Sequence, residues 1–312
     1  MTRRRHTLVL AAASLTALAA AGAAQALTVG DAIPVPAKFA LGVAVTDDAV
    51  WTTDGTGTVS RIDPTARTVT TSIPVTDAAI ALAAGGSVWV IGSNSRASRI
   101  DPRTNAVVSS VPVARDPTGV GVGLGSLWVA GRNSQTITRI SLGTGKVTAR
   151  LRTPDIGRYV AVAGGSLWVA ANDTPTLWQL TPTGRLLKSI DLTDTPNGIV
   201  VTGHTLWIAG STNNRIVRID TVRRKVVGYT PIPKSDGFFG YGGAIAAGAS
   251  GVWVATLTHL LQLSPSTGKI VAATAVGRHP SHDPAGLSAV AVGRGGVWVG
   301  DADGKAVVPV TP

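Results

Sequence analysis

Apolar residues along the chain fall in short runs separated by turn-forming residues. In one representative stretch the runs cover residues 79–84, 87–92, 97–100 and 106–113, and Gly, Pro, Asn or Asp bounds each run. Each run is too short for a typical helix and suits a β-strand. The pattern therefore predicts an all-β chain.

Groups of four such runs recur along the chain, and one tryptophan marks each group. Seven of the eight Trp follow Val or Leu at spacings of 38, 39, 40, 39, 46 and 45 residues, and they are Trp51, Trp89, Trp128, Trp168, Trp207, Trp253 and Trp298. A second landmark follows, as in Arg61-Ile62-Asp63-Pro64 and Arg99-Ile100-Asp101-Pro102. Four strands per repeat are typical of a β-propeller blade, so seven repeats predict a seven-bladed β-propeller.

The two ends of the chain complement each other. The last repeat stops at Pro312, where its third strand should end, whereas residues 28–35 resemble the fourth-strand segment at residues 68–75. We therefore expect the N-terminal strand to close the last blade, which leaves no open edge in the ring. Residues 27–312 are predicted to form one domain.

The repeated residues favour structural roles. An Asp before Pro or a turn hydrogen-bonds its own backbone two residues further on, so Asp63, Asp101 and Asp220 are predicted to form turns. The seven repeated Trp are predicted to pack between blades. The eighth, Trp178, falls in a third strand and is expected to pack there.

The first 26 residues have the pattern of a signal peptide. Three arginines precede an uncharged run from Leu8 to Ala20, and Ala24-Gln25-Ala26 supplies a cleavage pattern. An uncleaved anchor is the alternative, and the run is disfavoured for that role because it is mostly Ala. We expect a secreted, extracytoplasmic protein with no membrane span after cleavage; whether export uses the general or the twin-arginine route stays open.

Composition narrows the chemistry. The chain has 28 Lys and Arg against 17 acidic residues, all of them Asp, and it has no Glu and no Cys. The lack of Cys excludes disulfides, thiolate metal sites and cysteine nucleophiles. Without the leader, 25 basic residues remain, yet Arg61, Arg99, Arg139 and Arg218 recur once in each of four blades and spread the charge around the ring. This distribution predicts no specific nucleic-acid partner, although the protein could associate with an anionic cell wall.

Most candidate site residues gather in two long segments, residues 234–243 and 277–286, which we expect on one face of the propeller together with other loops. Variable loops on a rigid scaffold commonly carry binding residues. The predicted ligand-binding residues are Phe238, Phe239, Tyr241, Arg158, Tyr159 and Arg115. The predicted acid–base cluster is His279, His282 and Asp283, and the candidate metal ligands are Asp236, Asp301 and Asp303.

Two motifs carry a family resemblance across the mature chain. The segments Gly-Ser-Leu-Trp-Val-Ala, at residues 125–130 and 165–170, and Arg-Ile-Asp-Pro-x-Thr-x-x-Val-Val, at residues 99–108, resemble secreted YVTN-type seven-bladed propellers. That group overlaps in architecture with the virginiamycin B lyase-like (streptogramin lyase) propellers. The lyase resemblance implies a His and a Glu acting with a divalent cation such as Mg²⁺, but this chain has no Glu. The motifs specify blades rather than chemistry.

Two functions remain open at this point. The favoured one is a monomeric, non-enzymatic binding protein without a cofactor, whose ligand is a small molecule, a glycan or a protein. The alternative is a lyase or hydrolase acting on a cyclic or lactone substrate. In that case His279 or His282 would be the base, and Asp236 or Asp283 would help to hold Mg²⁺.

Overall fold

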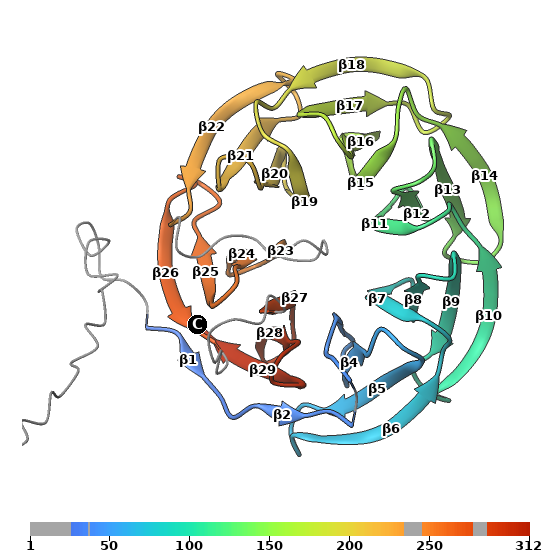
Figure 1. The fold of residues 1–312 in the computed structure, drawn as a ribbon, viewed down its shortest axis with the longest axis vertical. Helices are drawn as coiled ribbons and strands as arrows, with labels where there is room; N and C mark the ends of the chain where they lie inside the picture. The colour runs from blue at the N-terminus through green and yellow to red at the C-terminus, as the bar shows by residue number, and fades with distance from the viewer. Residues whose placement is uncertain (1–25, 37, 234–244, 277–285) are drawn as a thin grey trace, which may run out of the picture.

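The computed structural model describes residues 26–36, 38–233, 245–276 and 286–312. Every regular element in these ranges is a β-strand, and seven blades surround a central axis (Figure 1). Six of the blades are four-stranded sheets, and the seventh is a five-stranded sheet. Within the same ranges no helix has the length and hydropathy needed to span a membrane. The prediction of an all-β, seven-bladed propeller is confirmed.

Each blade runs from an inner strand at the axis to an outer strand at the rim. Blade 1 is β3 (Gly42–Val45), β4 (Val50–Thr53), β5 (Thr58–Asp63) and β6 (Thr68–Pro74). Blade 2 is β7 (Ala78–Ala84), β8 (Ser87–Gly92), β9 (Arg96–Asp101) and β10 (Ala106–Pro112). Blade 3 is β11 (Pro117–Gly123), β12 (Ser126–Gly131), β13 (Thr136–Ser141) and β14 (Val147–Arg152).

The remaining blades repeat this order. Blade 4 is β15 (Gly157–Ala163), β16 (Ser166–Ala171), β17 (Thr176–Leu180) and β18 (Leu186–Asp191). Blade 5 is β19 (Pro196–Thr202), β20 (Thr205–Gly210), β21 (Arg215–Asp220) and β22 (Lys225–Pro231). Blade 6 is β23 (Ile245–Gly248), β24 (Gly251–Ala255), β25 (His259–Leu263) and β26 (Ile270–Ala275). Blade 7 contains β27 (Leu287–Gly293), β28 (Gly296–Asp301) and β29 (Ala306–Thr311).

Blade 7 is completed from the other end of the chain. Two short strands, β1 (Thr28–Val29) and β2 (Ile33–Pro34), pair antiparallel with β29, with Val29 opposite Val310 and Ile33 opposite Val307. The amide of Gly30 donates to the Pro309 carbonyl at 2.8 Å between the two pairings. The strand expected at residues 28–35 therefore forms the outer edge of the last blade.

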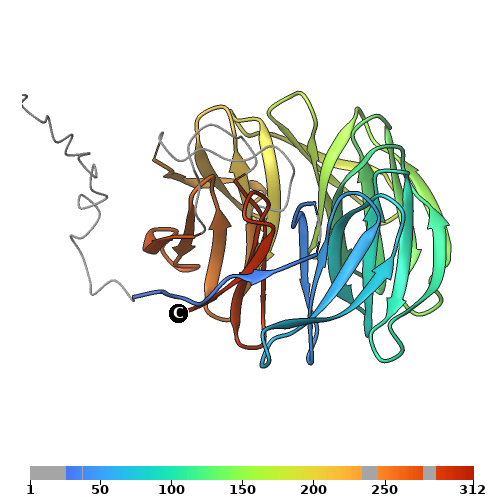
Figure 2. The same cartoon turned by 60° about the horizontal axis from the view of Figure 1, so that its bottom comes forward.

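Alternation of strand direction separates the connections onto two faces (Figure 2). Connections between second and third strands lie on the same face as connections from an outer strand to the next inner strand. We call this the funnel face. Both long segments singled out in the sequence fall between an outer strand and the next inner strand along the chain, but residues 234–244 and 277–285 lie outside the described residues.

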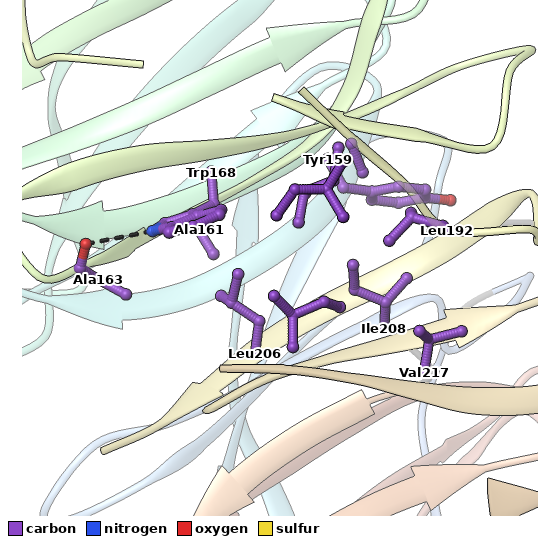
Figure 3. Packing of buried hydrophobic residues seen from close by; sticks show 12 residues of the cluster. Tyr159, Ala161, Ala163, Trp168, Leu192, Leu206, Ile208 and Val217 are labelled. Carbon is purple, nitrogen blue, oxygen red and sulfur yellow. Dashed lines mark hydrogen bonds between the residues drawn. The ribbon is translucent and has the colours of Figure 1, made fainter. Parts of the chain in front are cut away.

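The hydrophobic core is divided into seven clusters within the described residues, and each cluster fills one interface between adjacent blades. Each contains one of the repeated tryptophans from the second strand of a blade. Trp168 of β16, for example, lies in the same cluster as Leu206 and Ile208 of β20 and donates its indole N–H to the Ala163 carbonyl at 3.2 Å (Figure 3). Packing between blades is confirmed as the role of the repeated Trp.

Trp178 occupies the position expected for it. It lies in β17, is buried, and packs against Trp128 and Leu151 of blade 3. It adds a second indole to the interface between blades 3 and 4.

The repeated aspartates form the predicted turns between third and outer strands. Asp63 Oδ1 accepts the amides of Thr65 and Ala66 at 2.7 and 2.9 Å, and Asp220 Oδ1 accepts those of Val222 and Arg223 at 2.9 and 2.8 Å. These backbone hydrogen bonds lower the pKa of both carboxyls below the ordinary Asp value. Their role is to hold the turn.

Candidate functional site

Inner strands of five blades share a local distortion at the funnel face. The register against the second strand shifts between Ala78 and Ile80, Pro117 and Gly119, Gly157 and Tyr159, Pro196 and Ile199, and Leu287 and Ala289. A β-bulge of this kind releases a residue from the ladder and re-aims its side chain. The bulged residues Ala79, Thr118 and Arg158 all line one pocket.

This pocket, which we call the funnel pocket, has a volume of about 370 Å³ and lies where the inner strands meet the funnel face. Apolar side chains form most of its wall, among them Leu41, Val43, Ile80, Ile245 and Val290. Polar groups come mainly from blades 3 and 4 and the connections beside them, and they are Asp116, Thr118, Arg132, Arg158 and Tyr159. An apolar concavity with a few polar groups on one side is the usual form of a small-molecule site.

Arg132 and Asp116 form an ion pair at the edge of the funnel pocket. Both Nε and an Nη of Arg132 lie 3.0 Å from Asp116 Oδ2, and the Asn133 amide donates to the same oxygen at 3.0 Å. The Arg132 side chain remains 48% exposed, so its guanidinium stays accessible from solvent while its position is fixed. The pair joins the connection preceding β11 to the one following β12.

Arg158 and Tyr159 contribute a charge and an aromatic ring. The Arg158 guanidinium lies 5.0 Å from the centroid of the Tyr159 ring, a cation–π distance. The Tyr159 hydroxyl is buried and donates to Asn197 Oδ1 of blade 5 at 3.0 Å. Burial raises the pKa of Tyr159 to about 12, although the positive charges of Arg158 and Arg132 act in the opposite direction. Tyr159 is therefore a neutral hydrogen-bond donor and not a base at physiological pH.

Hydroxyl groups fix the bulges across blade boundaries. Thr118 Oγ1 donates to the Arg158 carbonyl at 3.1 Å, and Thr53 Oγ1 donates to the Ala79 carbonyl at 2.7 Å. Ser288 Oγ donates to the Ala40 carbonyl in the same way between blades 7 and 1. The rim of the funnel pocket is consequently held by contacts between neighbouring blades.

Close approach of β11 to β15 accounts for the Gly-Val-Gly-Val-Gly run at residues 119–123. A Cβ at Gly121 would lie 2.6 Å from the Val160 carbonyl oxygen, and one at Gly119 would clash with the Arg158 carbonyl. The glycines permit tight packing of blade 3 on blade 4 next to the Arg158 backbone. They are packing residues and do not form a phosphate-binding loop.

The structure distributes the predicted site residues unevenly. Arg158 and Tyr159 line the funnel pocket as expected, whereas Arg115 is exposed on the connection preceding β11 and does not belong to the described lining. Asp301 and Asp303 lie on the funnel face, where Asp301 accepts the Gly304 amide at 2.9 Å and Asp303 accepts the Gly286 amide at 3.0 Å. The remaining predicted residues lie outside the described part of the chain, and they are Asp236, Phe238, Phe239, Tyr241, His279, His282 and Asp283.

Metal binding receives no support from the described residues. They contain no group of three or more His, Asp, Glu or Cys side chains that could hold an ion. Asp301 and Asp303 hydrogen-bond backbone amides, as turn residues do. Their assignment as metal ligands stays a prediction.

Sequence reasoning missed the apolar lining of the funnel pocket. Ile80 and Ile245 are ordinary strand residues in the sequence, and only the ring closure brings blades 2 and 6 to the same cavity. A signal existed at the start of three inner strands, where a bulge follows Asp-Ala, Asp-Pro or Thr-Pro. That signal is too degenerate to identify a site without the fold.

Comparisons with known proteins identify the fold of this chain but no family. No family model and no curated protein matches this sequence. Among solved structures, a streptogramin B lyase is 17% identical with a TM-score of 0.74, covering 93% of this chain and 99% of the other. The likeness is one of fold. The same fold is found in hydrazine synthase of Kuenenia stuttgartiensis, which is 14% identical with a TM-score of 0.72, covering 89% of this chain and 97% of the other. It is also found in the Pan2 WD40 domain of Neurospora crassa, which is 14% identical with a TM-score of 0.65, covering 89% of this chain and 88% of the other. Propellers with unrelated activities thus have this architecture.

Proposed function

We propose that this protein binds a small molecule in the funnel pocket. The observation that carries the proposal is the convergence of Arg132, Arg158 and Thr118 on one side of a 370 Å³ cavity whose other walls are apolar. The apolar walls supply affinity through burial of ligand surface, and the polar side orients the ligand.

Rigidity supports a binding role. The funnel pocket is built from inner strands whose bulges are tied to neighbouring blades through Thr53, Thr118 and Ser288. A preorganised site loses little conformational entropy on binding, which favours affinity. The predicted contacts of Phe238, Phe239, Tyr241, His279 and His282 with the ligand are part of this proposal.

A thermal-shift screen of a chemically broad small-molecule library tests the proposal. Ser93 is exposed, follows β8 and lines the funnel pocket, so Ser93→Trp should fill it and suppress the shifts. Ser211 is exposed at the equivalent place after β20 in blade 5 and is outside the described lining, which makes Ser211→Trp a matched control. Compounds that stabilise wild type and both variants equally would contradict binding in the funnel pocket.

We also propose that the protein is exported and that its leader is removed after Ala26. The support is the arginine-flanked apolar run and the small-residue pattern that follows it. Mass spectrometry of the protein recovered from the extracytoplasmic fraction tests this. A mature form beginning at Leu27 is expected, and recovery of the intact chain in the membrane fraction would contradict it.

Catalysis is the second candidate, favoured by one observation, the shared fold with a streptogramin B lyase over 93% of the chain. This alternative would assign His279 or His282 as base and Asp236 or Asp283 as Mg²⁺ ligand. Incubation with streptogramin B and Mg²⁺, followed by reversed-phase chromatography, tests it. An unchanged retention time of the antibiotic would exclude this activity.

A further inference from the structure

The funnel pocket continues into a second, deeper cavity along the propeller axis. This cavity, which we call the channel chamber, has a volume of about 160 Å³. It shares Ile80, Ala81, Thr118, Tyr159 and Ile245 with the funnel pocket, so the two spaces adjoin. Its further lining is almost wholly apolar and comprises Leu82, Gly119, Val120, Val160, Gly198 and Ile199.

Charge is concentrated at the outer of these two spaces. Among its described lining residues, the funnel pocket has two guanidinium groups, Arg132 and Arg158, and one carboxylate, Asp116. Asp116 is held by Arg132 at 3.0 Å. The described lining of the channel chamber includes no ionisable side chain except the phenol of Tyr159. The funnel pocket therefore carries positive charge, and the channel chamber next to it is uncharged.

From this arrangement we infer that the ligand is an amphipathic organic acid. Its anionic group lies at Arg132 and Arg158, and its apolar part enters the channel chamber. The inference rests on the proposed binding function and names the class of molecule that the site takes. Guanidinium groups recognise carboxylates through paired, charge-assisted hydrogen bonds, whereas a cationic head would be repelled there.

The volume of the channel chamber limits the apolar part. An apolar protein cavity of about 150 Å³ is large enough to bind benzene. A phenyl ring or an alkyl chain of about six carbons thus matches the channel chamber. Each buried methylene should raise affinity about fourfold until the chamber is full.

Titration calorimetry with simple acids tests the inference directly. The probes are acetate, butanoate, hexanoate and phenylacetate, with hexylamine and hexanamide as matched molecules that lack the negative charge. We expect affinity to increase from acetate to hexanoate, phenylacetate to bind comparably to hexanoate, and hexylamine to show no binding. Equal affinity for hexanoate and hexanamide would overturn the assignment of an anionic head.

Two pairs of variants locate the head and the tail. Arg158→Gln should weaken hexanoate binding about tenfold, whereas Arg115→Gln, on the same face but outside the described lining, should not. Val120→Phe should fill the channel chamber and reduce hexanoate affinity to that of acetate. Val122 lies two residues further along β11, is 42% exposed and is outside the described lining, so Val122→Phe is the control.

The outcomes separate this inference from the function beneath it. If the screen yields ligands that Ser93→Trp blocks but these are neutral or cationic, the funnel pocket binds a ligand and the inferred class is wrong. If hexanoate binds and Val120→Phe has no effect, the apolar part does not enter the channel chamber and the inference fails. If hexanoate binding is unchanged in Ser93→Trp, the proposed function fails as well.

Discussion

The guanidinium of Arg139 lies 5.0 Å from the ring centroid of Trp128, its direct partner across the β12–β13 strand pair. Its Nε also donates to Ser126 Oγ at 2.8 Å. Arg61, Arg99 and Arg218 stack on Trp51, Trp89 and Trp207 at 5.6, 5.8 and 5.8 Å. The recurrent arginines are therefore a structural part of the blade, which explains why they recur with the tryptophans.

Replacement of Arg139 should reveal this role. Arg139→Met removes the cation–π contact and should lower the free energy of unfolding by about 0.5–2 kcal/mol. Arg139→Gln should lower the free energy of unfolding by a smaller amount. In blade 4 a glutamine, Gln179, occupies the equivalent position opposite Trp168 and donates to Ser166 Oγ at 3.0 Å. Urea denaturation measures both, and equal stability of the Met variant and wild type would contradict the role.

Truncation of a tryptophan at a blade interface should reduce stability far more than replacement of Arg139. Trp168 is fully buried between blades 4 and 5, so Trp168→Ala should reduce stability by about 3–5 kcal/mol. Val227 on the outer strand β22 is 42% exposed, and Val227→Ala should change stability by less than about 0.5 kcal/mol. Similar denaturation midpoints for the two variants would be inconsistent with a core divided among blade interfaces.

Substitution of Gly121 tests the contact between blades 3 and 4, and Gly57 in blade 1 provides the control. Gly121→Ala places a methyl group 2.6 Å from the Val160 carbonyl oxygen and should destabilise by about 1–3 kcal/mol through overpacking. Gly57→Ala meets no atom within 4 Å and should be tolerated. Thermal denaturation of the two variants measures the difference, and tolerance of Ala at position 121 would mean that the blades are less tightly packed there.

Acid should weaken the turns formed by the repeated aspartates. Backbone hydrogen bonds lower the pKa of Asp63, Asp101 and Asp220, so the unfolded chain binds their protons more readily than the native protein. Their stabilising contribution is present above the ordinary Asp pKa and is lost as pH falls through the lowered native pKa.

The triple variant with Asn at these three positions should be less stable than wild type at pH 7, and the difference should shrink below pH ~3. Urea midpoints measured between pH 7 and pH 2 test this. Asp47→Asn, at an exposed position between β3 and β4, is the control and should leave the urea midpoint at pH 7 close to that of wild type. A gap between the triple variant and wild type that persists at pH 2 would refute the turn mechanism.

Much of the fold could be predicted because its determinants are local and repeated. A tryptophan once per blade marks each interface, and an Asp that bonds its own backbone marks the turn in three blades, so Trp128 and Asp63 already indicate their places. The complementary chain ends predicted the pairing of residues 28–35 with the last blade.

The site was harder to predict from the sequence, because its geometry depends on how the ring of blades closes. Arg158 and Tyr159 were singled out as funnel-face residues, but Tyr159 is buried in the interface of blades 4 and 5 as well as lining the pocket. The apolar wall comes from single residues on distant blades, such as Ile80 and Ile245, which no local pattern distinguishes. The bulges that aim Thr118 and Arg158 depend on register between strands, which a single sequence does not specify.

Photolabelling with a diazirine analogue of hexanoic acid tests the central claim most directly, because it reports where a small acid binds. Cross-links should fall in peptides that contain residues 79–82, 118–120 and 158–160, and excess hexanoate should suppress them. Ser93→Trp should abolish this labelling, and Ser211→Trp should leave it unchanged. Labelling confined to outer strands such as β22, or equal labelling of Ser93→Trp and wild type, would contradict ligand binding in the funnel pocket.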